Sequence, residues 1–484
     1  MKSFKNYLDE THEEGVVSEV IHSIAYVSGL PGASLSEMVL FESGEVGQIM
    51  ALRPEHIEVL LLTRTSLEVG SRVARTGFPL QLRLSQNLLG QVIDSMGEVI
   101  EGKPIEEQDM RPVDVTPLGI SARQKITRTL ETGVILVDLM VPLGMGQREL
   151  ILGDRKTGKT HIARQAAVNQ ARLGNIVVYA MIGKKKSEIK QSIEYFRKSE
   201  VFSSMVMIAS SSHDAVGQVH VTPYTAMTVA EYFRDSGRDI TVILDDMTTH
   251  AKFYRELSLL ARKFPGRDSY PGDVFHIHSK LVERAGNFTL TREDQTKVEA
   301  SITCLPIADT VSGDMTGYIQ TNLMSMTDGH LLFDGGLYAS GRRPAVNPFL
   351  SVTRVGHQTQ NKLRRDINQR LYDLLNDYER TQSFLRFGAE LGENSRQILA
   401  MGDKVIAFFN QPANVLIPLP LQIVSLALLM AGSWDGKNMD RGVTAYRNSP
   451  EWGKKCEDLM NQNTLQELID RVRGEAQAWG KLFV

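Results

Sequence analysis

The sequence predicts a multi-domain fold with an N-terminal β-barrel, a central α/β domain built around a P-loop, and a C-terminal α-helical domain. Three observations predict it. Short strand-like runs separated by glycines continue to about residue 82. From residue 132 strand-like and helical runs alternate, and a P-loop pattern lies among them. After residue 351 apolar residues recur at helical spacing.

The barrel is expected over residues 15–82, after a short N-terminal extension of residues 1–14. Runs rich in Val, Ile and Leu alternate with glycine turns there, and 17–27 and 57–62 have the composition of strands. Several short strands close together in sequence favour a small closed barrel. No residue pattern in it indicates chemistry.

The central α/β domain is expected over residues 83–350. A hairpin-like segment at 90–105 and a proline-containing linker at 111–117 come first. Alternating strands and helices then predict βαβ units and a mainly parallel sheet. The expected strands are 149–152, 175–181, 204–209 and 239–244, and the helices include 188–198 and 225–236.

Residues 153–160 fit the pattern G-x-x-x-x-G-K-[ST]. This pattern predicts a phosphate-binding loop when a strand precedes it and a helix follows it. The apolar run 149–152 and the helix-forming residues 161–167 meet both conditions. The alternative, a glycine-rich turn that matches by chance, does not account for this context.

The chemistry of the loop follows from its residue types. Gly153 and Gly158 allow tight turns that point backbone N–H groups at a phosphate chain, beside the positive end of a helix. Lys159 is expected to reach the β- and γ-phosphates, and the Thr160 hydroxyl to bind Mg²⁺. The predicted phosphate-binding residues of the loop are Gly153, Asp154, Arg155, Lys156, Thr157, Gly158, Lys159 and Thr160.

An apolar strand ending in Asp245 and Asp246 predicts a second part of the site. Ligands of open α/β sheets bind at the carboxyl ends of strands, where an aspartate can hold Mg²⁺ through water. Asp245 is the predicted metal residue. The alternative, a turn or helix cap, is favoured for Asp246.

Lys184 follows another expected strand, where a catalytic site would need a base. A lysine can bind phosphate but cannot take a proton from water at neutral pH. The sequence therefore predicts a site that holds a nucleotide without cleaving it quickly. A solvated charged turn is the alternative for Lys185 and Lys186.

The C-terminal domain, residues 351–484, is predicted from amphipathic stripes. Core-facing positions recur at helical spacing at Leu363, Ile367, Leu371, Leu375 and Tyr378. Thr464 and Glu467 form a capping-box pattern ahead of a further apolar stripe. Core packing is the expected role of these stripes.

Composition excludes several classes of protein. The chain has 484 residues, a net charge of −3 and only two cysteines, which argues against a nucleic-acid binder, a disulfide scaffold and a cysteine metal site. No secretory signal is visible, and the longest apolar run, 421–432, is too short to span a bilayer and is expected to be a buried helix. Any membrane association is expected to come through partners.

Several stretches together resemble the alpha subunits of F-type ATP synthases. The matching segments are 147–160, 231–237, 265–275 and 344–356, and the similarity runs over nearly the whole chain. The resemblance implies a β-barrel, a RecA-like P-loop nucleotide domain and a helical domain. It also implies Mg-ATP or Mg-ADP at non-catalytic interfaces, within an enzyme complex that couples ATP synthesis or hydrolysis to H⁺ or Na⁺ transport.

The resemblance also implies roles for single residues. Arg354 corresponds to an arginine finger that reaches the neighbouring catalytic site, with a structural salt bridge as the alternative; Ser351 belongs to the same signature, whose final serine is Thr353 here. Gln411 matches one of two glutamines of the adenine pocket and is otherwise a polar residue at a helix end. The second glutamine falls at Ala413.

Position 184 is a glutamate in the catalytic beta subunits and usually a glutamine in alpha subunits. Lys184 therefore departs from both groups, and we expect it to pair with nucleotide phosphates and tighten binding. The N-terminal extension is shorter than the helical one that usually docks the peripheral stalk.

The partners implied are three catalytic beta subunits alternating with three alpha subunits, a central stalk gamma subunit and a peripheral stalk. The implied location is the cytoplasmic face of the bacterial inner membrane, reached through the membrane sector of the complex. The alternatives are a homohexameric secretion-type ATPase, disfavoured by Lys184, and an RNA-translocating hexamer. The latter is disfavoured by the charge balance.

Overall fold

The computed structural model describes residues 2–63, 67–105, 109–291, 295–386, 392–480 and 482–483. By packing, the chain divides into two units, described separately below. The first comprises 1–124, 171–309 and 315–327, and the second comprises 125–170, 310–314 and 328–484.

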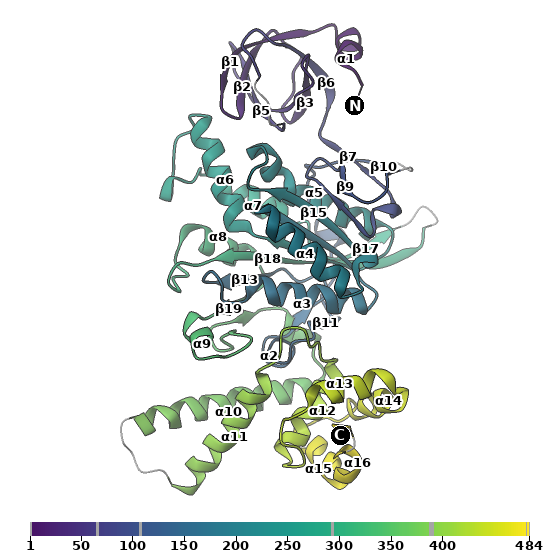
Figure 1. Cartoon of the computed structure of the whole chain (residues 1–484), viewed down its shortest axis with the longest axis vertical. Coiled ribbons are helices and arrows are strands. Elements are labelled where there is room, and N and C mark those ends of the chain that lie inside the picture. The colour runs from purple at the N-terminus through teal and green to yellow at the C-terminus, as the bar shows by residue number, and fades with distance from the viewer. Residues whose placement is uncertain are drawn as a thin grey trace. The chain divides into compact units, whose positions relative to one another are not determined.

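The predicted barrel forms at the N-terminus of the first unit, drawn in purple in Figure 1. Its antiparallel strands close in the order β1-β2-β5-β4-β3-β6 around apolar side chains such as Val39 and Val59, both 0% exposed. Helix α1 packs outside, with the buried Tyr7 against Leu40 and Ala74. The bounds are α1 Phe4–Thr11, β1 Glu14–Ile21, β2 Ile24–Ser28, β3 Glu37–Phe41, β4 Val46–Leu52, β5 Ile57–Leu61 and β6 Arg72–Pro79.

The single strand expected over 17–27 is wrong. The chain reverses between β1 and β2, because His22 takes a positive φ of 52° and starts a turn, and the two strands pair antiparallel as a hairpin. Because the residues on both sides of this turn are apolar, the composition of the segment did not predict the turn.

A mainly parallel sheet follows the barrel in the first unit, with strands in the order β18-β16-β14-β15-β8-β9 and β17 paired with β18. The central strands are buried along nearly their whole length, as expected for a parallel sheet covered on both faces. The strand bounds are β8 Gln91–Ile93, β9 Val99–Glu101, β14 Ile176–Lys184, β15 Met205–Ser211, β16 Ile240–Asp245, β17 Gly286–Thr291 and β18 Lys297–Asp309. A separate pair joins β7 Gln81–Leu84 to β10 Asp109–Pro112.

Helices of the first unit connect these strands (Figure 1). Their bounds are α4 Lys186–Lys198, α5 Val216–Asp235, α6 Met247–Leu260, α7 Val274–Val282 and α8 Tyr318–Met326. The helix expected over 225–236 begins earlier, at Val216, with Pro223 inside it. Short 3-10 turns lie at Gln86–Leu88, Ile120–Ala122, Phe202–Ser204 and Arg267–Ser269.

The second unit carries the P-loop between β13 and α3. Strand β13 pairs parallel with β19, which pairs antiparallel with β20, and the short β11 and β12 pair with each other. The bounds are β11 Thr129–Leu130, α2 Ile135–Met140, β12 Leu143–Gly144, β13 Glu149–Gly153, α3 Lys159–Arg172, β19 Gly329–Phe333, α9 Gly335–Ala339, β20 Val352–Thr353 and a 3-10 turn at Gly356–Thr359. The last two residues of α3 belong to the first unit.

The C-terminal domain is helical, as predicted, and lies in the second unit. The stripe Leu363, Ile367, Leu371, Leu375 and Tyr378 is buried along α10. The helices are α10 Lys362–Arg386, α11 Glu393–Phe409, α12 Leu419–Met430, α13 Met439–Asn448, α14 Pro450–Leu459, α15 Leu465–Gly474 and α16 Ala476–Gly480.

The capping box at the start of α15 forms in a modified way. Thr464 caps the helix by accepting a hydrogen bond from the Glu467 N–H, while the Glu467 carboxylate accepts from the Asn463 N–H. The carboxylate thus satisfies the donor one residue earlier than the standard pattern predicts.

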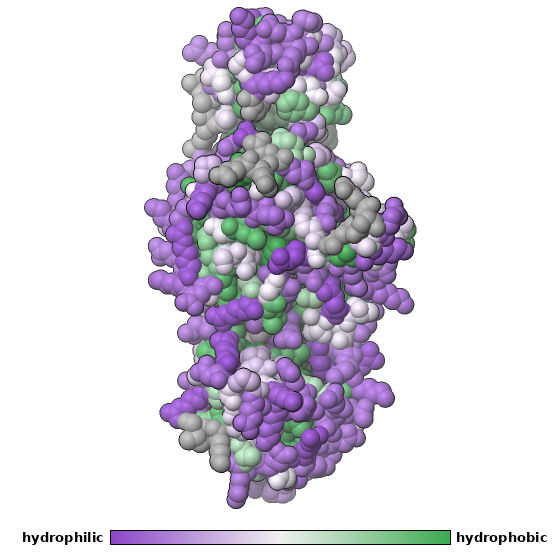
Figure 2. All heavy atoms as spheres, turned by 90° about the vertical axis from the view of Figure 1, so that its right-hand side faces the viewer, coloured by the Kyte–Doolittle hydropathy of each residue, from purple (hydrophilic) through white to green (hydrophobic). Residues whose placement is uncertain are grey.

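The apolar run 421–432 lies mostly in α12, whose side chains are almost all buried, as expected for a core helix. Among the residues that the structure describes, no helix combines the length and apolar character needed to cross a membrane. On the face drawn in Figure 2, hydrophilic residues cover most of the barrel and of the C-terminal helices, with hydrophobic residues in scattered patches.

Candidate functional site

The P-loop has the backbone geometry that its glycines predict. A side chain at Gly153, the last residue of β13, would place its Cβ 2.5 Å from the Phe333 carbonyl oxygen, so only glycine fits. Gly158 has a φ of +104°, which side-chain-bearing residues rarely adopt. The loop therefore leaves the strand and enters α3 as the pattern requires.

Hydrogen bonds of its own side chains stabilise the conformation of the loop. The buried Lys159 ammonium donates to the carbonyl oxygens of Gly153 and Asp154 at 2.7 and 2.6 Å. The Thr157 hydroxyl donates to the Asp154 carbonyl at 2.7 Å. The Asp154 carboxylate accepts from the Thr310 hydroxyl at 2.6 Å and the Gly313 N–H at 2.9 Å. Asp154 is thus a loop anchor, and its carboxylate does not point to a role in binding phosphate.

The remaining loop residues are more open. Arg155 and Lys156 are exposed, and Thr160 is half-buried in the first turn of α3. No hydrogen-bond partner of the Thr160 hydroxyl is found in the described part of the chain. At this helix N-terminus the hydroxyl fits the predicted contact with a cation or a phosphate oxygen.

In the first unit, Lys184 ends β14 and Asp245 ends the adjacent parallel strand β16. The Lys184 ammonium lies 2.6 Å from Asp245 Oδ1 and 3.2 Å from Asp246 Oδ2. Burial works against the charged form of Lys184, but the two carboxylates outweigh it and raise the pKa of Lys184 above its usual value. Lys184 is therefore a fixed cation.

The two aspartates differ in their other partners. The Tyr179 hydroxyl donates to Asp245 Oδ2 at 2.9 Å. Asp246 caps α6 by accepting from the Thr249 N–H at 2.6 Å and the Thr249 hydroxyl at 3.1 Å. The helix-cap alternative for Asp246 is confirmed.

The surroundings of Asp245 differ from those of the predicted magnesium site. Lys184 holds one oxygen of Asp245 and Tyr179 holds the other, so a cation already occupies the approach to this carboxylate. In the described ranges, no group of three or more His, Cys, Asp or Glu could hold a metal ion. The roles of Thr160 and Asp245 toward Mg²⁺ stay predictions.

Arg354 directly follows β20 in the second unit. Its N–H donates to the Asp328 carbonyl at 2.9 Å, while its side chain is exposed and makes no ion pair within the described residues. The salt-bridge alternative is therefore not observed for Arg354.

Two hydroxyls that precede Arg354 in the chain hydrogen-bond to the nearby backbone. The buried Ser351 hydroxyl donates to the Asn347 carbonyl at 2.6 Å and accepts from the Leu332 N–H at 2.9 Å. The Thr353 hydroxyl donates to the Pro142 carbonyl at 2.9 Å and accepts from the Gly356 N–H at 3.0 Å. The Ser351 hydroxyl is thus engaged with the backbone, and the catalytic role predicted for it stays a prediction.

Gln411 is buried with its amide group engaged. Its Oε1 accepts from the Ile135 N–H at 2.9 Å, and its Nε2 donates to the carbonyls of Gly133 and Val415 at 2.7 and 2.5 Å. These bonds join two chain segments, so the amide is not turned toward a ligand.

Sequence reasoning missed His161, which directly follows the P-loop. Its Nε2 lies 3.1 Å from the carbonyl oxygen of Ala413, at the predicted position of the second adenine glutamine. Burial lowers the pKa of His161. Its place next to Thr160 was the available signal. Tyr179 was also missed. The signal for it in the sequence was a hydroxyl-bearing residue within an otherwise apolar strand.

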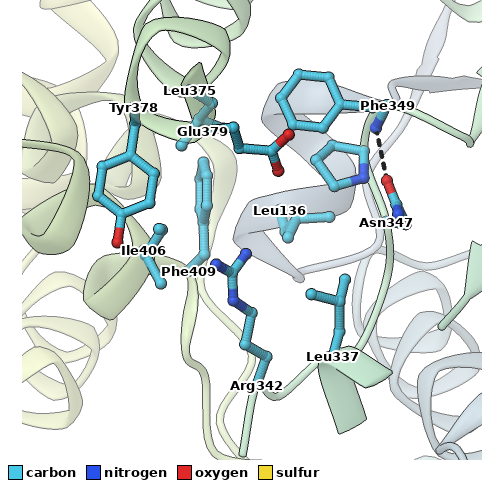
Figure 3. Close-up of a pocket in the computed structure, with 11 residues that line it drawn as sticks. Leu136, Leu337, Arg342, Asn347, Phe349, Leu375, Tyr378, Glu379, Ile406 and Phe409 are labelled. Carbon is cyan, nitrogen blue, oxygen red and sulfur yellow. Dashed lines mark hydrogen bonds between the residues drawn. The ribbon is translucent and has the colours of Figure 1, made fainter. Parts of the chain in front are cut away.

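A small cavity in the second unit is a separate feature (Figure 3). Arg342 and Glu379 both point into it, among Leu136, Phe349 and Phe409. Its volume of about 30 Å³ is that of roughly one water molecule. It is too small for a purine.

Comparison with known proteins places these residues in two matched regions. Residues 133–353 match the ATP synthase alpha/beta family, nucleotide-binding domain, and residues 360–449 match the ATP synthase alpha/beta chain, C terminal domain. The P-loop, Lys184, Asp245 and Ser351 lie in the first range, which ends directly before Arg354, and Gln411 lies in the second.

Similar whole proteins carry one name. The ATP synthase subunit alpha of Clostridium acetobutylicum is 36% identical over 419 residues, 86% of this chain and 82% of that protein. That of Caldanaerobacter subterraneus subsp. tengcongensis is 37% identical over 423 residues, 87% of this chain and 83% of that protein. The ATP synthase subunit alpha 2 of Polaromonas naphthalenivorans is 37% identical over 436 residues, 90% of this chain and 83% of that protein.

Proposed function

Because the chain belongs to the family of ATP synthase alpha subunits, we propose that it is a non-catalytic, nucleotide-binding subunit of an F-type rotary ATP synthase. It binds ATP or ADP through its P-loop and supplies Arg354 to a catalytic site on a neighbouring beta subunit. The chain thus takes part in synthesis or hydrolysis of ATP without carrying the group that activates the attacking water.

The observation that supports the non-catalytic role most directly is the chemistry at Lys184. Hydrolysis needs a group that polarises the attacking water. At the position where the family's catalytic subunits have a glutamate, this chain has an ammonium held by two carboxylates. A charged lysine has no lone pair with which to accept a proton. This also argues against the homohexameric secretion-type ATPase.

Arg354 supports the contribution to a neighbour. An exposed guanidinium with no ion pair among the described residues is available to a partner, and Ser351 and Thr353 fix the backbone on which it stands. A guanidinium at a transferring phosphoryl group stabilises the charge of the transition state.

Nucleotide binding rests on the P-loop residues 153–160. Mg²⁺ enters this proposal through the Thr160 hydroxyl, at the N-terminus of α3. Gln411 acts on base recognition indirectly, because its amide holds the backbone at Gly133 and Val415 in place. Pairing of Lys184 with a nucleotide phosphate remains part of the proposal.

The assembly and location follow the family. Three copies of the chain alternate with three beta subunits around a gamma subunit and contact a peripheral stalk. The complex works at the cytoplasmic face of a bacterial inner membrane, through a membrane sector that transports H⁺ or Na⁺. The domain boundaries proposed for the chain are 15–82, 83–350 and 351–484, after the short extension 1–14.

The test is an Arg354→Ala variant assembled with its beta and gamma partners. Steady-state ATP hydrolysis by the complex should fall by about 10³-fold or more, because the transition-state charge loses its guanidinium. Nucleotide binding to the variant chain should be unchanged. Arg365→Ala removes another exposed arginine and should leave hydrolysis near the wild-type rate. Near-normal turnover of the Arg354→Ala complex would contradict the proposal.

A further inference from the structure

Glu149, the first residue of β13, is a fully buried acid in the second unit. It is 0% exposed, and its Oε2 accepts a hydrogen bond from the Gln147 amide at 2.8 Å. Its Oε1 has no hydrogen-bond partner within the part of the chain that the structure describes. Burial raises the pKa of this carboxyl well above its usual value, against the hydrogen bond from Gln147, and the nearby Asp328 carboxylate raises the pKa further. Glu149 therefore keeps its proton and is uncharged in the folded chain.

The register of three strands brings Glu149 into line with Thr353, which directly precedes Arg354. Glu149 pairs with Gly329 in β19, and Gly329 pairs with Thr353 in β20. Gly329 places no side chain between them, and a Cβ at this position would lie 2.6 Å from Glu149 Oε2. The carboxyl group of Glu149 therefore extends across β19 toward β20.

The Gln147 amide joins this acid to the segment that carries Arg354. Its Nε2 donates to Glu149 Oε2 at 2.8 Å and to Thr353 Oγ1 at 3.1 Å. Its Oε1 accepts from the Gly144 N–H at 2.8 Å. Both amide hydrogens thus have acceptors, and one of the two acceptors is Glu149. The orientation of the amide toward Thr353 therefore depends on an oxygen atom at position 149.

The neighbouring residue Arg148 supports the same segment by a separate route. Its Nε and Nη2 donate to the Asp328 carboxylate at 3.0 and 2.6 Å. The Asp328 carbonyl oxygen in turn accepts from the Arg354 N–H at 2.9 Å. This anchor does not involve Glu149, so a change at Glu149 should shift the segment locally and leave its pairing with β19 in place.

We propose that Glu149 is a positioning residue for Arg354. As an uncharged acid it holds the Gln147 amide against Thr353, and it leaves the Arg354 guanidinium available to a neighbouring catalytic site. The inference rests on the proposed function, in that Arg354 serves a neighbouring beta subunit.

The uncharged state of Glu149 matters because Arg354 is close to it. The positive charge of Arg354 acts to lower the pKa of Glu149, so the two side chains interact electrostatically. Opposite charges attract strongly where little water separates them. A charged carboxylate at position 149 would therefore draw the guanidinium back toward its own chain, whereas the neutral acid does not.

The test is steady-state ATP hydrolysis by complexes assembled with the beta and gamma partners. In Glu149→Ala the Gln147 amide loses an acceptor, so kcat should fall by about tenfold or more while KM stays within about twofold. Glu149→Gln keeps the size, the acceptor oxygen and the uncharged state, so its kcat should stay within about twofold of the wild type. Glu131→Ala removes a partly buried acid elsewhere in the same unit and should behave as the wild type.

A second pair of variants separates positioning from a general structural role. Because Glu149 acts through Arg354, adding Glu149→Ala to Arg354→Ala should lower kcat no further. Thr353→Val removes the other acceptor of the Gln147 amide and should lower kcat to about the same extent as Glu149→Ala. This variant decides the matter if Glu149→Ala does not assemble.

The outcomes distinguish this inference from the proposed function. Near-normal turnover of Arg354→Ala overturns both. A large loss in Arg354→Ala with near-normal kcat in Glu149→Ala, or in Thr353→Val where that variant decides, overturns the inference alone. A kcat of Glu149→Gln as low as that of Glu149→Ala also overturns it, because the uncharged form would then not be the working one. A further loss on adding Glu149→Ala to Arg354→Ala would show that Glu149 acts by another route, which contradicts the inference.

Discussion

At the scale of single residues, Lys159 and Lys184 hold their positive charges in different surroundings. Lys159 lies within the P-loop and donates to backbone carbonyls of its own loop, while Lys184 pairs with two carboxylates. A phosphate at the loop can take the donors of Lys159 from neutral carbonyls at small cost. We therefore expect Lys159 to contribute more to nucleotide affinity than any other single side chain.

A Lys159→Met variant tests this expectation. Methionine keeps most of the volume of the buried side chain and removes its charge. A hydrogen bond to a charged group contributes about 1.5–3 kcal/mol, so ATP affinity should fall between about tenfold and about a hundredfold. The measurement is ATP titration of the purified variant, and Lys190→Met, on the exposed side of α4, is the matched control. Equal affinity of the two variants would contradict the role of Lys159.

Single residues could be predicted where their role depends on a pattern of neighbouring positions in the sequence. The P-loop pattern alone predicted the strained positions at Gly153 and Gly158. The partners of Lys184 were not predictable, because Asp245 is distant in sequence and only the pairing of β14 with β16 brings the two together. The engaged amide of Gln411 likewise depends on backbone at Gly133, far away in the chain.

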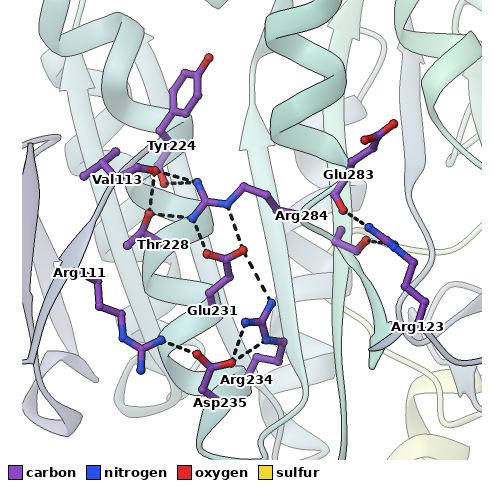
Figure 4. Close-up of polar contacts among 11 residues, drawn as sticks. Arg111, Val113, Arg123, Tyr224, Thr228, Glu231, Arg234, Asp235, Glu283 and Arg284 are labelled. Carbon is purple, nitrogen blue, oxygen red and sulfur yellow. Dashed lines mark hydrogen bonds and ion pairs between the residues drawn. The ribbon is translucent and has the colours of Figure 1, made fainter. Parts of the chain in front are cut away.

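At the scale of elements, a buried arginine joins α5 to the segment after α7 (Figure 4). Arg284 is 1% exposed and donates to both carboxylate oxygens of Glu231, at 3.1 and 2.6 Å. It also donates to the Val113 carbonyl at 2.9 Å and the Thr228 hydroxyl at 2.8 Å. Nearby, the guanidinium groups of Arg234 and Arg111 donate hydrogen bonds to the Asp235 carboxylate (Figure 4).

An Arg284→Met variant should be strongly destabilised. Breaking a buried pair leaves the Glu231 carboxylate without its main partner, which costs about 3–5 kcal/mol. Adding Glu231→Met removes that charge and should recover a large part of the loss. Chemical denaturation measures both, with Arg197→Met, which breaks an exposed pair with Glu101, as a control worth less than about 1 kcal/mol. A small loss in the single variant would show that the network contributes little.

Three histidines connect α5, α6 and α7 in the first unit. His250 Nδ1 lies 3.0 Å from His278 Nε2, and His250 Nε2 lies 3.0 Å from the His220 carbonyl oxygen. The His220 ring stacks on His250 and Tyr254, and Lys263 adds positive potential nearby. Burial lowers the pKa of His250 to about 4 and that of His220 to about 3. These imidazoles are neutral in the folded protein.

The cluster should make stability depend on pH. An unfolded histidine binds a proton near pH 6.5. Because folded His250 does so only near pH 4, the unfolded state gains protons first, and the free energy of unfolding decreases as pH falls between these values. From pH 7 to pH 5 the wild type should lose about 2 kcal/mol more than a His250→Gln variant.

The measurement is urea denaturation at several pH values. His213→Gln removes an exposed imidazole and is the matched control, which should follow the wild type. If the wild type and His250→Gln lose stability in parallel as pH falls, the buried histidine is not the source of the dependence.

Element-scale prediction was best for long periodic patterns. The buried stripe of α10 followed from 3.6-residue spacing, and the parallel strands from apolar runs between helical ones. The hairpin at His22 was missed because apolar residues continue on both sides of a turn that contains no glycine. The early start of α5 was missed because its first half contains a proline that the tertiary environment tolerates.

At the scale of the whole molecule, the sequence motifs predicted the family and the order of barrel, α/β and helical parts. The division by packing was not predictable. The P-loop falls in one unit and Lys184 with its aspartates in the other, because the chain returns between units several times. Patterns along a chain do not reveal which distant segments pack as one body.

The central claim for the whole molecule is that it holds a nucleotide and does not cleave it. The site chemistry supports this, because a cationic Lys184 replaces a base and the exposed Arg354 is available to a neighbour. The feature at Lys184 concerns this chain alone, so the claim that the chain does not cleave a bound nucleotide can be tested without partners.

The most direct measurement is a single-turnover experiment, in which labelled ATP is bound to an excess of the purified chain and its conversion to ADP is followed. We predict that the bound ATP stays intact over many minutes, because the lysine at position 184 cannot activate water as a catalytic glutamate would. Conversion of the bound ATP on the order of once per second, with no second polypeptide present, would contradict the account.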